Sequence, residues 1–94
     1  MNTETCIVHT WTGRNPFAFD SYTMPNIDLA HRLSDILLSG NGVIRTQVVH
    51  ARFVDGWPHE ERWDRTAQGG STHRVATYER DRKGGIVREG MTDV

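Results

Sequence analysis

One segment of this chain repeats its apolar residues with the period of an α-helix, and this feature limits the possible folds most. The repeat consists of Ile27, Ala30, Leu33, Ile36 and Leu37, which together form a single apolar stripe. We predict a helix over residues 24–39, capped by Thr23 or Asn26 and followed by Gly40 in the left-handed conformation. A lone helix with one apolar stripe needs a sheet to pack against, because no second helix is predicted.

The other segments are rich in β-branched and aromatic residues and lie between glycine-containing turns. They predict strands at residues 5–12, 17–22, 43–55, 60–66 and 72–80, with a short sixth candidate at 86–88. Short turns join most of these strands, so neighbouring strands must be antiparallel. The predicted fold is therefore an α+β domain of order ββαβββ, with or without a sixth strand. One helix lies on one face of an antiparallel sheet of five to six strands.

The helix is expected to cover its face of the sheet through Leu33 and Leu37, packed onto Phe17, Phe19 and Phe53. One helix can cover only one face of a sheet. The opposite face is therefore expected to be open and available to a partner.

The chain has 94 residues, which suffice for one domain with a thin core. We expect a single domain over residues 1–94, frayed at residues 1–3 and 90–94. Cys6 is the only cysteine, which excludes a disulfide-stapled secreted scaffold. The sequence contains neither an apolar run of spanning length nor the pattern of a signal peptide. We therefore expect a cytoplasmic protein without a membrane partner.

Histidines are the first candidates for chemistry, and the chain has five: His9, His31, His50, His59 and His73. No pair has the spacing of a zinc finger or a zincin. Cys6 lies in an apolar strand, which is typical of an inert thiol. Nucleophile elbows and phosphate-binding loops are missing. We expect no metal, no cofactor and no catalytic residue, and keep a small histidine-centred enzyme as an alternative.

The strongest functional signal is a mixture of arginine and aromatic residues on the predicted strands of the second half. From it we predict a partner-binding surface made of Arg52, Trp57, His59, Arg62, Arg65, Arg74, Tyr78 and Arg80. Tryptophan and arginine dominate the hot spots of protein interfaces. The same residue types also stack on bases and bind phosphates. Trp63 is instead expected in the core, because buried aromatics supply much of the area of a thin core.

The net charge of −1 disfavours a dedicated polyanion binder. A protein partner is therefore expected, and the chain is predicted to be a non-enzymatic protein-binding module. In size and lack of motifs it is similar to small phage or mobile-element proteins that block a host protein complex, anti-CRISPR proteins among them. That similarity implies a stoichiometric inhibitor or adaptor. A nucleic-acid-binding domain with an Arg/aromatic sheet face is the alternative, and unpaired sheet edges favour a homodimer.

Overall fold

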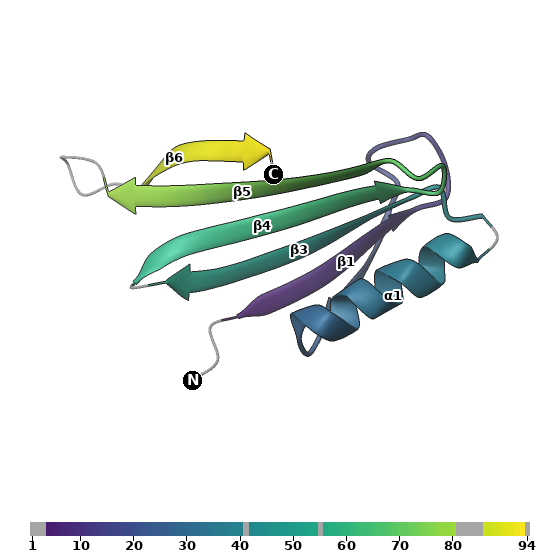
Figure 1. Cartoon of the computed structure of the whole chain (residues 1–94), viewed down its shortest axis with the longest axis horizontal. Helices are drawn as coiled ribbons and strands as arrows, with labels where there is room; N and C mark the ends of the chain where they lie inside the picture. The colour runs from purple at the N-terminus through teal and green to yellow at the C-terminus, as the bar shows by residue number, and fades with distance from the viewer. Residues whose placement is uncertain (1–3, 41, 55, 81–85, 94) are drawn as a thin grey trace.

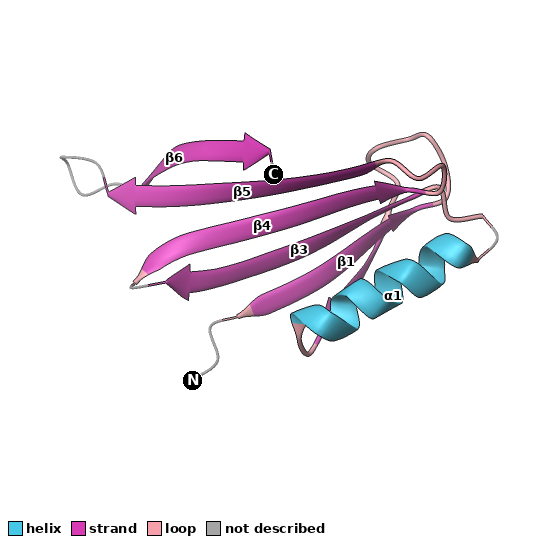
Figure 2. Cartoon of the chain, viewed as in Figure 1, coloured by secondary structure: helices cyan, strands magenta, loops and turns pink. Residues whose placement is uncertain are grey.

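The fold follows the predicted order of elements. The structure is a computed structural model that describes residues 4–40, 42–54, 56–80 and 86–93. Its elements are β1 (Thr5–Trp11), β2 (Asp20–Met24), α1 (Ile27–Ser39), β3 (Arg45–Val54), β4 (Trp57–Thr66), β5 (Ser71–Arg80) and β6 (Ile86–Asp93). The strands form one six-stranded sheet of order β2-β1-β3-β4-β5-β6, and all its pairs are antiparallel (Figure 2). This confirms the α+β prediction.

The helix serves as the crossover between two strands that do not touch. Both β2 and β3 pair antiparallel with β1, so they run parallel to each other and need a long connection. α1 supplies it and packs against β1, β2 and β3, away from β5 and β6 (Figure 1). The helix therefore covers only part of one sheet face.

The core lies between α1 and the two central strands beside it. Val8 and Val48 are fully buried and directly opposite each other in the sheet. Ala30 packs on them from the helix, and Leu33 and Leu37 add partly buried contacts. Ile27 also packs against this core, whereas Ile36, the remaining member of the predicted stripe, is 67% exposed.

Alternation along the strands separates the side chains into two sets. Those on the side of Val8 and Val48 face α1, and we call this the helix side. The opposite side, which no described helix covers, is the open face. By register the open face carries Ile7, His9, Trp11, Arg45, Gln47, Val49, Phe53, Pro58, Glu60, Arg62, Asp64 and Arg74.

The helix ends differ from the prediction. α1 begins at Ile27, and Asn26 is the cap, because its side chain accepts a hydrogen bond from the Leu29 N–H at 2.9 Å. Thr23 lies in β2. The prediction for Gly40 is wrong: its φ is −82°, and its N–H donates to the Leu37 carbonyl. Among the described residues of this connection, Gly42 has a positive φ, of 97°.

The predicted role of the phenylalanines is also wrong. The loop before β2 turns on Asn15, whose side chain accepts a hydrogen bond from the Phe17 N–H and whose carbonyl accepts one from the Ala18 N–H. As a result Phe17 is 89% exposed, and Phe19 also lies before β2 begins. Phe53 is on the open face. Leu33 and Leu37 therefore do not pack onto these rings.

Several strands are longer than predicted. β4 begins at Trp57 rather than at residue 60, because Gly56 adopts a φ of 81° and lets the chain reverse at once. β6 continues to Asp93, so residues 90–93, which were expected to fray, lie in a strand paired with β5. Residues 1–3 and 94 lie outside the described residues.

Candidate functional site

The predicted partner-binding residues do not share one surface. Arg62 and Arg74 face each other across β4 and β5 on the open face. The register places four others on the helix side: Arg52, Trp57, His59 and Arg65. For Tyr78 and Arg80 the backbone lies in β5, but their side chains are outside the described residues. Trp57 was expected near the open face, and this is wrong because it pairs with Val54 on the other side.

Arginines of both faces are held by carboxylates of the same chain. Arg45 binds Asp64 at 2.5 Å, and Arg52 lies 3.6 Å from Glu61. Two further ion pairs join Arg62 with Glu60 and Arg65 with Asp35. Arg62 also donates to the Gln47 side chain at 3.1 Å. These exposed pairs each contribute under about 1 kcal/mol, but they neutralise most of the positive charge expected to face a partner.

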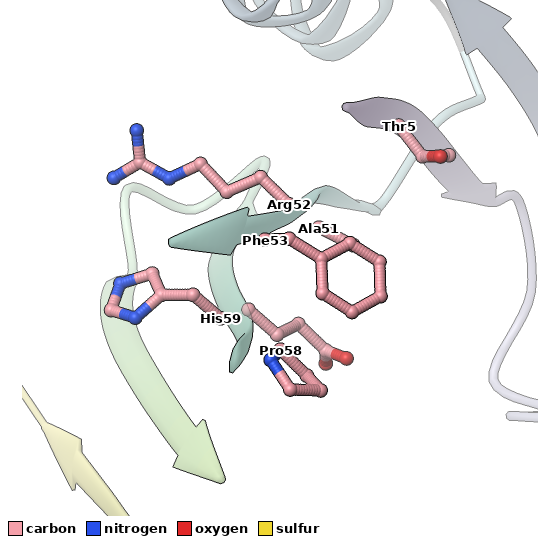
Figure 3. A pocket seen from close by; sticks show the side chains of 7 residues that line it. Thr5, Ala51, Arg52, Phe53, Pro58 and His59 are labelled. Carbon is pink, nitrogen blue, oxygen red and sulfur yellow. The ribbon is translucent and has the colours of Figure 1, made fainter. Parts of the chain in front are cut away.

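The open face has a shallow groove at the end of the β3–β4 hairpin. Its volume is about 270 Å³, and its lining includes Thr5, Ala51, Phe53, Pro58 and Glu60. The Phe53 ring is 57% exposed and lies beside its cross-strand partner Pro58 (Figure 3). Arg52 and His59 also line the groove, but their side chains point to the other side of the same strands (Figure 3). The groove thus has an exposed aromatic side chain and lies on the paired strands β3 and β4.

At the other end of the open face, an aromatic cluster is already filled by the chain itself. Phe19 contacts both His9 and Trp11, with ring centroids 5.0 and 5.3 Å away. Trp11 donates its indole N–H to the Pro16 carbonyl, and the Arg45 guanidinium lies 4.3 Å from its ring centroid. These contacts fold the loop before β2 onto the sheet, so this end has a structural role.

His9 belongs to this cluster, and its pKa has a consequence for stability. Burial lowers the pKa of His9 below its usual 6.5, and the nearby Arg62 lowers it further. The unfolded chain therefore takes up the proton more readily than the folded chain. The free energy of unfolding should fall as the pH is lowered from about 6.5 toward the lower folded value.

Chemical denaturation between neutral pH and pH 5 measures this slope. His9→Gln should make the slope shallower, because its side chain does not titrate. His31, whose pKa is lowered mainly by burial and then by Arg65, should keep part of the slope in place. An unchanged slope in His9→Gln would contradict the assignment.

On the helix side, the Glu61 carboxylate lies close to basic side chains from three strands. It accepts a hydrogen bond from His73 at 2.8 Å, and His59 lies 3.9 Å from its other oxygen. Arg52 is 3.6 Å from that oxygen. Trp63 stacks flat on His73, with centroids 4.6 Å and planes 11° apart. A carboxylate–histidine pair is the arrangement of a general base, but here Trp63 covers one side of the imidazole.

A second cluster on the helix side was missed by the sequence analysis. Glu4, Cys6 and His50 each offer one ligand atom, and these atoms all lie within 4.8 Å of one another. The Cys6 thiol donates to Glu4 at 3.5 Å, and His50 is 2.8 Å from the same oxygen. Burial and then Glu4 raise the pKa of Cys6 to about 11, so without a metal it is an inert thiol. The sequence indicates that Glu4 and Cys6 share a side, because they are two positions apart in an extended segment. It does not indicate that His50 lies opposite Cys6, because that depends on the register between β1 and β3.

Comparison of the chain with family models, with curated proteins and with solved structures gave no match. In the part of the chain that is described, α1 is the only helix, and no helix has the length and apolar character that crossing a membrane requires.

Proposed function

We propose that this chain is a protein-binding module whose partner docks on the open face over the groove at Phe53. The observation that carries this proposal is the exposed Phe53 ring beside Pro58 in a hollow of about 270 Å³. An aromatic side chain at a shallow groove is a typical anchor of a protein interface. The partner is expected to present an apolar side chain to this groove.

The charges of the same face favour a protein over a nucleic acid. Arg45 and Arg62 are engaged by Asp64 and Glu60, so a phosphate would have to compete with two carboxylates. A protein with its own mixed charges can add to such a network without breaking it. We therefore propose a stoichiometric inhibitor or adaptor that acts on a host protein complex through this surface. The homodimer stays a prediction, with the edge strand β2 as the place where a second copy would pair.

The test compares two exposed apolar residues on opposite sides of the molecule. Phe53→Ser alters the groove, and Ile36→Ser alters the outer surface of α1, where Ile36 is 67% exposed. Both variants and the wild type are immobilised and incubated with a lysate of the native host, at low and at high salt. Bound material is identified by mass spectrometry and by nucleic-acid staining.

The wild type and Ile36→Ser should retain one dominant protein at equal stoichiometry, also at high salt. Phe53→Ser should weaken that interaction at least thirtyfold, the effect of a hot spot worth about 2 kcal/mol. Equal retention by Phe53→Ser would remove the groove from the proposal. Recovery of nucleic acid that high salt releases would instead favour the nucleic-acid alternative.

A further inference from the structure

Three chemically different metal ligands meet on the helix side at the start of β1. Cys6 and His50 are directly opposite each other in the β1–β3 pair, so their side chains leave the sheet on the same side. Glu4 precedes Cys6 by two residues, and in extended chain this spacing returns its side chain to that side. The register of a rigid, central strand pair therefore brings the three together. This cluster plays no part in the binding surface proposed above.

Two of the three ligands are fixed by their burial. Cys6 is 2% exposed and His50 is 7% exposed, and Cys6 belongs to the core cluster. Glu4 is exposed and approaches from the solvent side, where it contacts both. A site of this kind has two ligands held by packing and a third that can close over a captured ion.

We propose that Glu4, Cys6 and His50 form a binding site for a zinc-type transition-metal ion, with a fourth position open to water or to an external ligand. Sulfur, imidazole nitrogen and carboxylate oxygen are the donors that zinc combines in proteins. A hard cation such as Mg²⁺ or Ca²⁺ prefers oxygen ligands and is not expected here. Binding replaces the thiol proton by the metal, and that proton leaves to the solvent.

Two of the three ligand separations lie near those of such an ion, and the third, between the Cys6 sulfur and the His50 nitrogen, is at most 4.8 Å and must shorten when the ion binds. Zinc bond lengths of about 2.0–2.3 Å place neighbouring tetrahedral ligand atoms roughly 3.4–3.6 Å apart. The Cys6 sulfur is 3.5 Å from the Glu4 oxygen, which already matches. The His50 nitrogen is 2.8 Å from that oxygen and must move away by about half an ångström. Rotation of the exposed Glu4 side chain supplies this movement without disturbing the sheet.

The experiment uses the untagged chain, purified under reducing conditions and stripped of metal. Zn²⁺ is titrated by calorimetry, and Co²⁺ is added separately to record its thiolate charge-transfer band. The wild type should bind one equivalent of each ion and show that band. A zinc concentration a hundredfold above Kd should also raise Tm by at least about 10 °C.

The variants separate ligand loss from misfolding. Cys6→Ser should abolish the charge-transfer band, and Glu4→Gln should weaken zinc binding by more than about a hundredfold, since a ligand matters more than its outer-shell support. Glu4 is exposed, so Glu4→Gln should keep the native circular dichroism spectrum. The matched control is Glu61→Gln, which alters the other carboxylate–histidine cluster and should leave zinc affinity unchanged.

Several results would overturn the assignment. The first is that the wild type does not bind zinc, and the second is that its cobalt complex lacks the thiolate band. The third is that Glu61→Gln loses zinc binding while Glu4→Gln keeps it. The last result would move the ion to Glu61, His59 and His73. None of these outcomes depends on whether a partner binds at Phe53, so the two proposals succeed or fail separately.

Discussion

Replacing Trp63 by alanine should lower the free energy of unfolding by about 3 kcal/mol, the low end for a large aromatic residue because Trp63 is only partly buried. The indole lies between two rings. It stacks on His73, and His31 from α1 meets it edge-on with centroids 4.8 Å apart. It also packs against the buried core cluster. Its removal therefore deletes the aromatic packing between the helix and β4 and β5 and leaves a cavity, although the Arg65–Asp35 ion pair still links α1 to β4.

Urea denaturation followed by far-ultraviolet circular dichroism measures this loss, and the melting temperature should drop by about 12 °C or more. The matched control is Trp57→Ala, in the same strand and on the same side of the sheet. Trp57 is exposed at the strand end, so this variant should lose less than about 1 kcal/mol. Equal losses in the two variants would contradict the central role of Trp63.

Much of this arrangement was predictable, since the evidence for it is local in the sequence. The helical spacing of Ala30, Leu33 and Leu37 identified α1 and the side it buries. The alternating, β-branched segments identified the strands and their antiparallel order. Trp63 is expected in the core because buried aromatic residues supply much of the area of a thin core, and the structure confirms that it packs there.

The wrong prediction for Phe17 and Phe19 also has a local cause, which the alternating polarity of this segment hides. Residues 17–22 alternate in polarity as a strand does, but Asn15 and Pro16 precede them. The Asn15 side chain accepts a hydrogen bond from the Phe17 N–H and forms a turn, so no strand starts at that point. Turn chemistry at Asn15 overrode the strand pattern, and β2 begins only at Asp20.

The candidate sites were less predictable, because they depend on contacts between distant strands. Alternation says which residues share a face but not which face the helix covers. For that reason the residues of the predicted partner-binding surface lie partly on the open face and partly on the helix side. The meeting of Cys6 with His50 is set by the β1–β3 register, which a crossover through α1 determines. No short turn joins β1 to β3, so the sequence offers no turn geometry from which their register could be predicted.

The same crossover buries a polar contact between α1 and β3 that can be tested by a double-mutant cycle. The hydroxyls of Ser34 and Thr46 are 2.7 Å apart, and both residues are fully buried. No buried side-chain polar atom of the described residues lacks a partner. Removing one hydroxyl leaves the other unsatisfied in the core, which costs about 1–3 kcal/mol.

The two single variants should lose different amounts of stability, because the hydroxyl that remains in each has different alternative hydrogen-bond acceptors. In Thr46→Val, Ser34 can turn to the carbonyl of Ala30 one helical turn earlier, so the loss should be about 1 kcal/mol. In Ser34→Ala, Thr46 lies on a strand under the helix with no such carbonyl, and the loss should approach 2 kcal/mol.

The double variant Ser34→Ala/Thr46→Val should lose less than the sum of the single losses, because neither hydroxyl then remains to be satisfied. Urea denaturation of all four proteins gives the coupling energy, which should be at least about 1 kcal/mol. Additive losses would mean that the two hydroxyls do not depend on each other. Strong coupling would show that this contact helps to hold α1 in its register on β3, the same strand that carries His50 and Phe53.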